Sequence, residues 1–132
     1  MNGDTDRCVL VVEDEPDMAL LVTTILEDSG YRVLAAGDGR QGLAVLECAH
    51  PDLILLDMKM PVMNGWEFAK ALHERYKNHP PVVVFTAAEN AARTASEIGA
   101  DGFIGKPFDL DQFISYIGRF FDDSSHAAVN LQ

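Results

Sequence analysis

Cysteines and long apolar runs are scarce in this sequence, and their scarcity excludes two classes of protein. The chain has 2 cysteines in 132 residues, too few for a disulfide framework. Cys8 and Cys48 each stand beside apolar residues, and we expect both to be buried, unreactive thiols. No apolar run approaches the about 18 residues that span a membrane, and the polar segment from Met1 to Arg7 does not resemble a signal peptide. We therefore expect a soluble cytoplasmic protein without a membrane partner.

Positively charged residues are also scarce. The chain has 10 Lys and Arg against 21 Asp and Glu, which gives a net charge of −11. A surface for nucleic acid gains most of its affinity by neutralising phosphates with cations, so we expect this chain not to bind nucleic acid. If the chain acts on an anionic substrate, a divalent cation has to offset the acid excess.

The chain has the length of one domain, and apolar runs alternate with helical patterns along it. The apolar runs predict strands at Cys8–Val12, Arg32–Ala36, Leu53–Leu56, Val82–Phe85 and Gly102–Ile104. Periodic apolar positions predict helices at Pro16–Ser29, Gly39–Cys48, Asn64–Tyr76, Glu89–Ile98 and Leu110–Phe121. The first, third and fourth apolar runs lack polar alternation, which is typical of parallel strands covered on both faces. We therefore predict a flavodoxin-like, doubly wound α/β fold: a five-stranded parallel sheet in the order 2-1-3-4-5, with five helices on its two faces.

Polar side chains gather where the predicted strands end. Glu13 and Asp14 follow the first strand, Asp57 follows the third, Thr86 the fourth and Lys106 the fifth. Because the carboxyl ends of parallel strands share one edge of the sheet, we expect these groups to converge. Clustered carboxylates need a cation, and their hard oxygen atoms favour Mg²⁺. Asp57 is then the available nucleophile towards phosphorus, since this edge offers no serine or cysteine beside a histidine.

Several segments, taken together and in order, resemble the receiver domain of two-component response regulators. They read VLVVEDEP (Val9–Pro16), AAGDGRQGL (Ala35–Leu43), PDLILLDMKMPVMNG (Pro51–Gly65), FTA (Phe85–Ala87) and GFIGKPF (Gly102–Phe108). The resemblance covers Arg7 to Phe121, so we expect residues 7–121 to form the receiver domain and residues 1–6 and 122–132 to be flexible termini. The sequence leaves open whether this domain stands alone or is cut from a longer protein.

The resemblance implies a role for each polar residue at this edge. Asp57 would accept a phosphoryl group from a phosphohistidine of a histidine kinase or a histidine phosphotransfer protein. Mg²⁺ would be bound by Asp14, Asp57 and the backbone carbonyl of Lys59, and by Glu13 through a water molecule. Lys106 would pair with Asp57 before phosphorylation and with a phosphoryl oxygen afterwards.

A conformational switch is implied as well. Thr86 would move towards the phosphoryl group and Phe103 would follow it inwards. The partner would be an unidentified downstream protein, which would bind the face formed by helix Glu89–Ile98, the strand carrying Phe103 and the outer side of helix Leu110–Phe121. The peptide bond between Lys106 and Pro107 would be cis.

Some positions depart from the family or tune its kinetics. Glu13 is longer than the aspartate often found there, and Phe103 lacks the tyrosine hydroxyl of some members. Lys59 and Ala88 occupy positions at which the family tunes the access of attacking water. The lifetime of the phosphoryl group therefore does not transfer from relatives.

The sequence thus predicts a phosphoacceptor signalling protein whose only reactions are Mg²⁺-dependent self-phosphorylation and self-dephosphorylation. The alternative is a receiver-like interaction module that works without phosphorylation. A haloacid-dehalogenase-like phosphatase is disfavoured, because Met58 and Lys59, and no second aspartate, follow Asp57. A flavodoxin is disfavoured because the acids of the first strand-to-helix turn would repel a flavin phosphate.

The remaining polar and aromatic residues suggest no second site. The histidines lie at predicted helix ends, in loops or in the tail, without the spacing of metal ligands, and we expect each to be solvated: His50, His73, His79 and His126. We expect Trp66 and Phe68 to pack in the core or partly at the surface. Either Phe120 or Phe121 exceeds what one helix needs for its core, which leaves open a contact surface for a homodimer or a partner.

Overall fold

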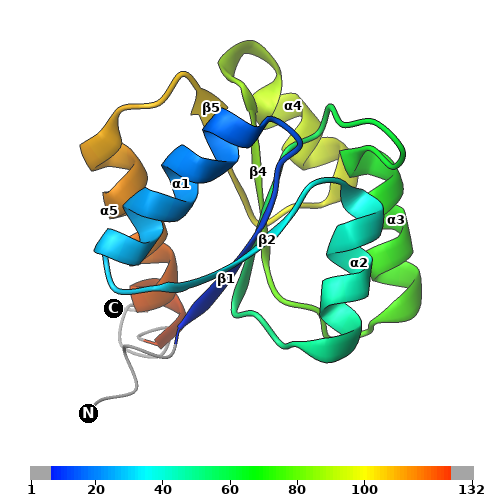
Figure 1. Cartoon of the computed structure of the whole chain (residues 1–132). Coiled ribbons are helices and arrows are strands. Elements are labelled where there is room, and N and C mark those ends of the chain that lie inside the picture. The colour runs from blue at the N-terminus through cyan, green and yellow to red at the C-terminus, as the bar shows by residue number, and fades with distance from the viewer. Residues whose placement is uncertain (1–6, 126–132) are drawn as a thin grey trace, which may run out of the picture.

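The computed structural model describes residues 7–125 of the chain, with their side chains as far as residue 121 (Figure 1). The strands are β1 (Cys8–Val12), β2 (Arg32–Ala36), β3 (Leu53–Leu56), β4 (Val82–Ala87) and β5 (Gly102–Lys106). The helices are α1 (Pro16–Asp28), α2 (Gly39–Cys48), α3 (Gly65–Arg75), α4 (Ala88–Ile98) and α5 (Leu110–Ser125). Strand and helix alternate throughout, as predicted.

The strands form one parallel sheet in the order β2-β1-β3-β4-β5, which confirms the predicted topology. Figure 1 shows α1 and α5 on one face of the sheet and α2, α3 and α4 on the other. β1 and β3 are neighbours, and the registers Val12 with Ala36 and Val12 with Leu56 bring the carboxyl ends of β2, β1 and β3 level with one another. The loops that follow β1 and β3 therefore start at the same edge of the sheet.

Each face of the sheet carries its own hydrophobic core. Under α1 and α5 the core includes Val22, Phe113 and Ile117, and under α2 and α3 it includes Leu43 and Phe68. Every residue of β1 and β3 is buried. Both faces of these strands contact hydrophobic layers, which is why their sequences are continuous apolar runs. Burial on both sides fixes β1 and β3, and hence the positions of the acids that follow them.

Most helices begin at a residue whose side chain satisfies a free backbone N–H group. Asp38 accepts a hydrogen bond at the start of α2, and Asn64 and Glu67 form a reciprocal capping box at the start of α3. α4 has no such cap, since Ala87 precedes it, and it ends at Gly99 in the left-handed conformation. None of the helices within residues 7–125 combines the length and the apolar character needed to cross a membrane.

Some element boundaries differ from the sequence prediction. β4 and β5 run on to Ala87 and Lys106, so Thr86 and Lys106 lie within the last residues of strands and not after them. The backbone pairing between β4 and β5 continues through these residues. α5 continues past the expected end at Phe121 to Ser125, while residues 1–6 and 126–132, which we expect to be flexible, lie outside the described residues.

One prediction about buried side chains was wrong. Cys8 is buried as predicted, but Cys48 is exposed, because the buried face of α2 runs through Leu43 and Leu46 and Cys48 lies off that face. On α5 the exposed large apolar residues are Leu110 and Ile114, whereas Phe121 is buried and Phe120 is partly buried. Short apolar patterns do not reveal which side of a helix end faces the sheet.

Close packing between β5 and α4 makes a prediction about Gly105. A Cβ atom at Gly105 would lie 2.6 Å from Cα of Ala88, which belongs to the backbone and has little room to move. Gly105→Ala is therefore expected to lower the free energy of unfolding by about 1–3 kcal/mol. Urea denaturation of the wild type and the variant measures this difference in the free energy of unfolding.

Gly118→Ala is the matched control, because a Cβ atom built at Gly118 has no neighbour within 4 Å apart from adjacent residues and the backbone of its own helix. Gly118 is inside a helix, so alanine is expected to stabilise the protein by about 0.5–1 kcal/mol. Equal effects of the two substitutions would contradict the packing argument.

Candidate functional site

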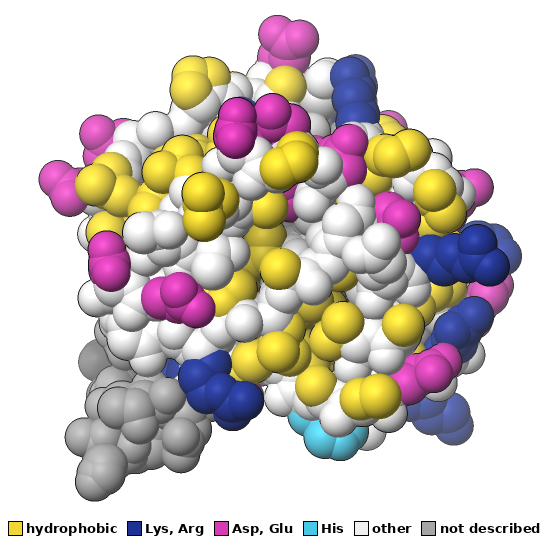
Figure 2. Space-filling view, in the orientation of Figure 1, with side chains coloured by type: hydrophobic (Ala, Val, Ile, Leu, Met, Phe, Trp, Pro, Cys, Tyr) yellow, Lys and Arg dark blue, Asp and Glu magenta, His cyan; other side chains and the backbone are white. Residues whose placement is uncertain are grey.

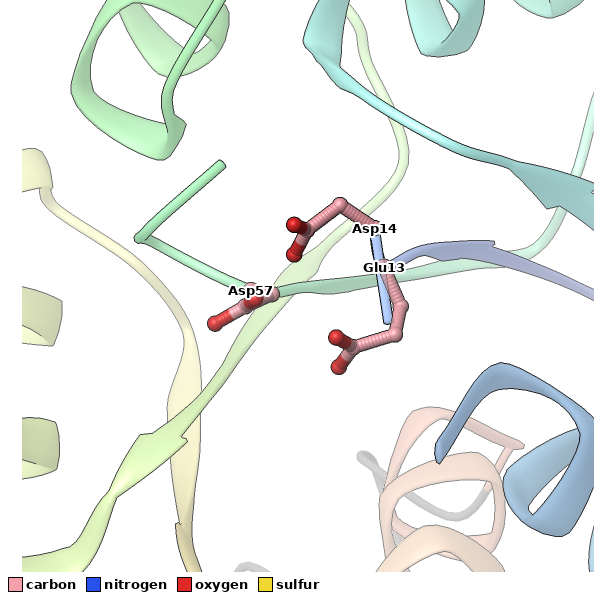
Figure 3. Close-up of side chains that lie close together, drawn as sticks. All are labelled: Glu13, Asp14 and Asp57. Atoms are coloured by element: carbon pink, nitrogen blue, oxygen red, sulfur yellow. The ribbon is translucent and has the colours of Figure 1, made fainter. Parts of the chain in front are cut away.

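Three carboxylates meet at the carboxyl ends of β1 and β3. Oxygen atoms of Glu13, Asp14 and Asp57 all lie within 4.8 Å of one another. Figure 3 shows the side chains converging from these two neighbouring strand ends, with Asp14 turned towards Asp57. Glu13 and Asp57 are buried and Asp14 is exposed. The sequence prediction that these acids converge is confirmed.

The backbone at the strand ends holds these acids in place. The N–H group of Asp57 donates to the carbonyl of Val12 over 2.9 Å, and the N–H group of Glu13 donates to the carbonyl of Ala36 over 3.0 Å. These bonds continue the parallel ladder for one step beyond the strands. The spacing of the carboxylates is therefore a property of the sheet register.

Lys106 reaches the cluster from the end of β5. Its Nζ atom lies 2.8 Å from Oε1 of Glu13 and 3.7 Å from Oδ1 of Asp57. The same ammonium lies 4.6 Å from the ring centre of Phe85, a cation–π distance. A Lys106–Asp57 ion pair was expected, but sequence reasoning missed Glu13 as the nearer partner. The additional methylene of glutamate is the signal that would have indicated it.

The carboxyl group of Asp57 has a perturbed pKa. The pKa of Asp57 is raised from 3.8 to about 6: burial raises it most and the charge of Glu13 also raises it, while Lys106 and a hydrogen bond from the backbone of Lys59 lower it. Asp14 adds a smaller increase. Burial and the neighbouring negative charges therefore outweigh the positive charge of Lys106 at this carboxyl group.

The donor set fits a hard divalent cation. It consists of carboxylate oxygens alone, and in the described part of the chain it is the one group of three or more His, Cys, Asp or Glu side chains close enough to hold an ion. Oxygen ligands from a few carboxylates, with remaining positions left to water or a phosphate, are characteristic of Mg²⁺ sites. The perturbed charge balance gives such an ion a further electrostatic advantage.

The other predicted site residues lie on β4, on β5 and in the loop after β3. Thr86 is buried near the end of β4, and Lys59, which is exposed, follows Asp57 in the loop after β3. Phe103 on β5 is 47% exposed, so its ring points outwards in this structure. The peptide bond between Lys106 and Pro107 is cis, in agreement with the sequence prediction.

Asp57→Asn is expected to raise the melting temperature of the metal-free protein. The folded-state pKa of about 6 exceeds the ordinary value of 3.8, so the charged form opposes folding. This penalty is complete above pH 6 and is relieved as the pH falls towards 3.8, because folding then takes up a proton. The gain in melting temperature, a few degrees at pH 7, should therefore be smaller at pH 4.5. Thermal denaturation at the two pH values, in the presence of a chelator, measures it.

Thermal denaturation with Mg²⁺ in place of the chelator provides the control. Saturating Mg²⁺ should raise the melting temperature of the wild type more than that of the variant, since the cation offsets the charge that the substitution removes. A gain at pH 7 that is unchanged at pH 4.5 would contradict the assignment of the effect to the charge of Asp57.

Comparison with known proteins agrees with the geometry. Residues 9–118 match the family described as "Response regulator receiver domain". The DNA-binding response regulator MtrA of Mycolicibacterium smegmatis is 33% identical over 111 residues, which are 83% of this chain and 48% of that protein. The chain spans about half the length of the curated relatives it matches.

Solved structures show the same similarity. The chemotaxis response regulator CheY4 of Vibrio cholerae has a TM-score of 0.76 at 34% identity, over 86% of this chain and 98% of that one. The response regulator TrrA of Thermotoga maritima, solved in complex with Mg(2+)-BeF, has a TM-score of 0.75 at 26% identity, over 86% and 97% of the two chains.

An α/β sheet of order 2-1-3-4-5 with an acidic cluster and a lysine at its carboxyl edge defines a signalling domain and not a classical enzyme. This chain belongs to the response regulator receiver domain family of two-component signalling. Because MtrA is described as DNA-binding and is about twice as long, the absence of nucleic-acid binding by this chain stays a prediction.

Proposed function

We propose that this chain accepts a phosphoryl group on Asp57 in a reaction that depends on Mg²⁺. The single observation that carries the proposal is the convergence of three carboxylates with one ammonium. Within this group the buried Asp57 lies beside both other acids and within 3.7 Å of Lys106. The solved complex of TrrA with Mg(2+)-BeF supports the proposal by similarity.

Each residue has a role in this proposal. Asp14 and Asp57, with the backbone carbonyl of Lys59, would hold Mg²⁺, and Glu13 would reach it through water. The ion supplies positive charge for the phosphoryl oxygens. The carboxylate of Asp57 attacks phosphorus as the P–N bond to the donor histidine breaks and its imidazole leaves, and Lys106 stabilises the negative charge on the transferred group. The phosphoryl donor would be a phosphohistidine on a histidine kinase or on a histidine phosphotransfer protein.

Labelling with a small phosphodonor tests this function. The wild type is incubated with acetyl phosphate and Mg²⁺, and intact mass is measured with and without a chelator. We expect one added phosphoryl group that appears only with Mg²⁺ and that hydroxylamine removes, because hydroxylamine cleaves acyl phosphates. An adduct that is stable to hydroxylamine, or no adduct, would reject the proposal and favour an interaction module that works without phosphorylation.

We further propose that the phosphoryl group switches a partner surface on α4, β5 and α5. Phe103, Leu110 and Ile114 are large apolar residues exposed on β5 and α5, and such residues suit contact with a protein. α4 lacks a side-chain cap and is anchored by the small residues Ala91 and Ala95. A helix that buries only small side chains and lacks an N-terminal side-chain cap can be shifted by a new hydrogen bond between Thr86 and the phosphoryl group.

This switch is expected to appear in hydrogen exchange. Beryllofluoride with Mg²⁺, which mimics an acyl phosphate, should change amide protection in α4 and β5 of the wild type by several-fold, whereas α2 serves as the internal reference. Thr86→Ala should bind the same ligand but lose the change in α4, because it lacks the hydroxyl group. Unchanged protection of α4 and β5 in the wild type would rule out this output surface.

A further inference from the structure

Two histidines contact each other at the end of the sheet opposite the carboxylates. His73 lies in the last turn of α3 and His79 in the loop before β4. Nδ1 of His73 is 3.0 Å from Nε2 of His79, and the ring centres are 4.7 Å apart with 63° between the ring planes. Figure 2 shows acidic side chains gathered at the upper edge of the molecule, the end of the sheet towards which β1 runs in Figure 1. His73 is exposed, as predicted, and His79 is partly buried; the contact between the two rings was not predicted.

The outer nitrogen of each ring faces a backbone carbonyl. Nε2 of His73 lies 3.2 Å from the carbonyl oxygen of Ile98, and Nδ1 of His79 lies 2.7 Å from that of Pro80. A carbonyl oxygen can only accept, so both outer nitrogens must carry hydrogen. In neutral rings the two inner nitrogens are then bare lone pairs, 3.0 Å apart. Such a contact requires a positive centre between them, which is either an additional proton or a metal ion.

The geometry suits two ligands of one ion. Zinc binds imidazole nitrogen at about 2.0–2.1 Å, so nitrogens separated by this distance subtend an angle of about 90–100° at the ion. That angle lies between the square-planar and tetrahedral arrangements of divalent transition metals with imidazole ligands. Metal-binding histidines usually donate their other ring N–H group to a carbonyl or carboxylate, and both rings already do so.

We propose that His73 and His79 form a binding site for a divalent transition-metal ion of the Zn²⁺ class. Water or an exchangeable ligand fills the remaining positions, since no third His, Cys, Asp or Glu within the described residues completes a cluster with this pair. His79 also lines a cavity of about 420 Å³ between the ends of α2 and α3, through which water and small ligands reach it. The ion would also restrain the end of α4, because His73 donates to Ile98.

This site is independent of phosphorylation at Asp57. It lies at the opposite end of the sheet, and it offers nitrogen ligands, whereas Mg²⁺ prefers oxygen. Saturating Mg²⁺ can therefore occupy the carboxylates while a second metal is titrated. Failure of one proposal would leave the other unaffected.

A zinc titration of the whole chain in saturating Mg²⁺ tests the inference. We expect the NMR signals of the His73 and His79 rings to shift together, with calorimetry giving one ion per chain. His73→Gln and His79→Gln should each weaken Zn²⁺ binding at least about tenfold. His50→Gln is the matched control, since His50 is exposed beside the same cavity but is no member of the pair, and its affinity should equal that of the wild type.

Copper provides a second measurement on the unmodified protein. Cu²⁺ bound at this pair should show electron paramagnetic resonance couplings to two imidazole nitrogens, and His50→Gln should retain both. Zinc that shifts neither ring, or that binds the His73→Gln variant as tightly as the wild type, would mean an adventitious ion only. A proton signal shared by the two rings that persists in excess Zn²⁺ would also overturn the inference, because the proton would then be the positive centre.

Discussion

Asp57→Asn is expected to abolish the incorporation of phosphate from acetyl phosphate, to below detection at times when the wild type is fully labelled. Asparagine has nearly the same shape, and its amide oxygen can still accept the hydrogen bond from the backbone of Lys59. It lacks the anionic oxygen that attacks phosphorus. The substitution therefore removes the nucleophile while leaving the buried site packed, and intact mass measures the result.

Asp28→Asn provides the control for this loss. Asp28 is an exposed aspartate at the end of α1, outside the acidic cluster, and its substitution should leave labelling unchanged. The stability measurements described above show whether the Asp57 variant is folded. A hydroxylamine-sensitive adduct on the folded Asp57→Asn protein would show that another carboxylate is the acceptor.

The sequence predicted the fold because the apolar runs of β1, β3 and β4 are continuous. Such runs occur where a parallel sheet is covered on both faces, and that arrangement puts all carboxyl ends at one edge. The convergence of Glu13, Asp14 and Asp57 followed from this rule alone. Their roles came from the resemblance to receiver domains, since no pattern of spacing states which acid accepts a phosphoryl group.

Features that depend on the direction of a side chain could not be predicted from the sequence. Cys48 and Ile114 lie near the boundary between the buried and exposed sides of their helices, where a small rotation decides burial. The partner of Lys106 depends on the length of Glu13, and the contact between His73 and His79 depends on the path of a loop. Loop paths carry no periodic signal, so this contact became visible only with coordinates.

Asp14→Asn is expected to weaken Mg²⁺ binding at least about tenfold, as measured by calorimetry. Glu13 is held by the ammonium of Lys106 and accepts a hydrogen bond from the backbone of Glu15, and Asp57 lies within reach of the same ammonium. Asp14 is exposed and makes no ion pair with a described residue, so its charge is the one most available to a cation. Its removal should therefore cost more affinity than the loss of any exposed acid outside the cluster.

Labelling separates a binding role from a chemical role for Asp14. Since Asp57 remains, the Asp14→Asn variant should accept phosphate again when Mg²⁺ is raised to saturate its weakened site. Asp17→Asn is the matched control, because Asp17 is also exposed and close in sequence but lies outside the cluster, in the first turn of α1. If both variants bound Mg²⁺ as tightly as the wild type, the ion would have to be held elsewhere, and the proposed chemistry at Asp57 would lose its source of positive charge.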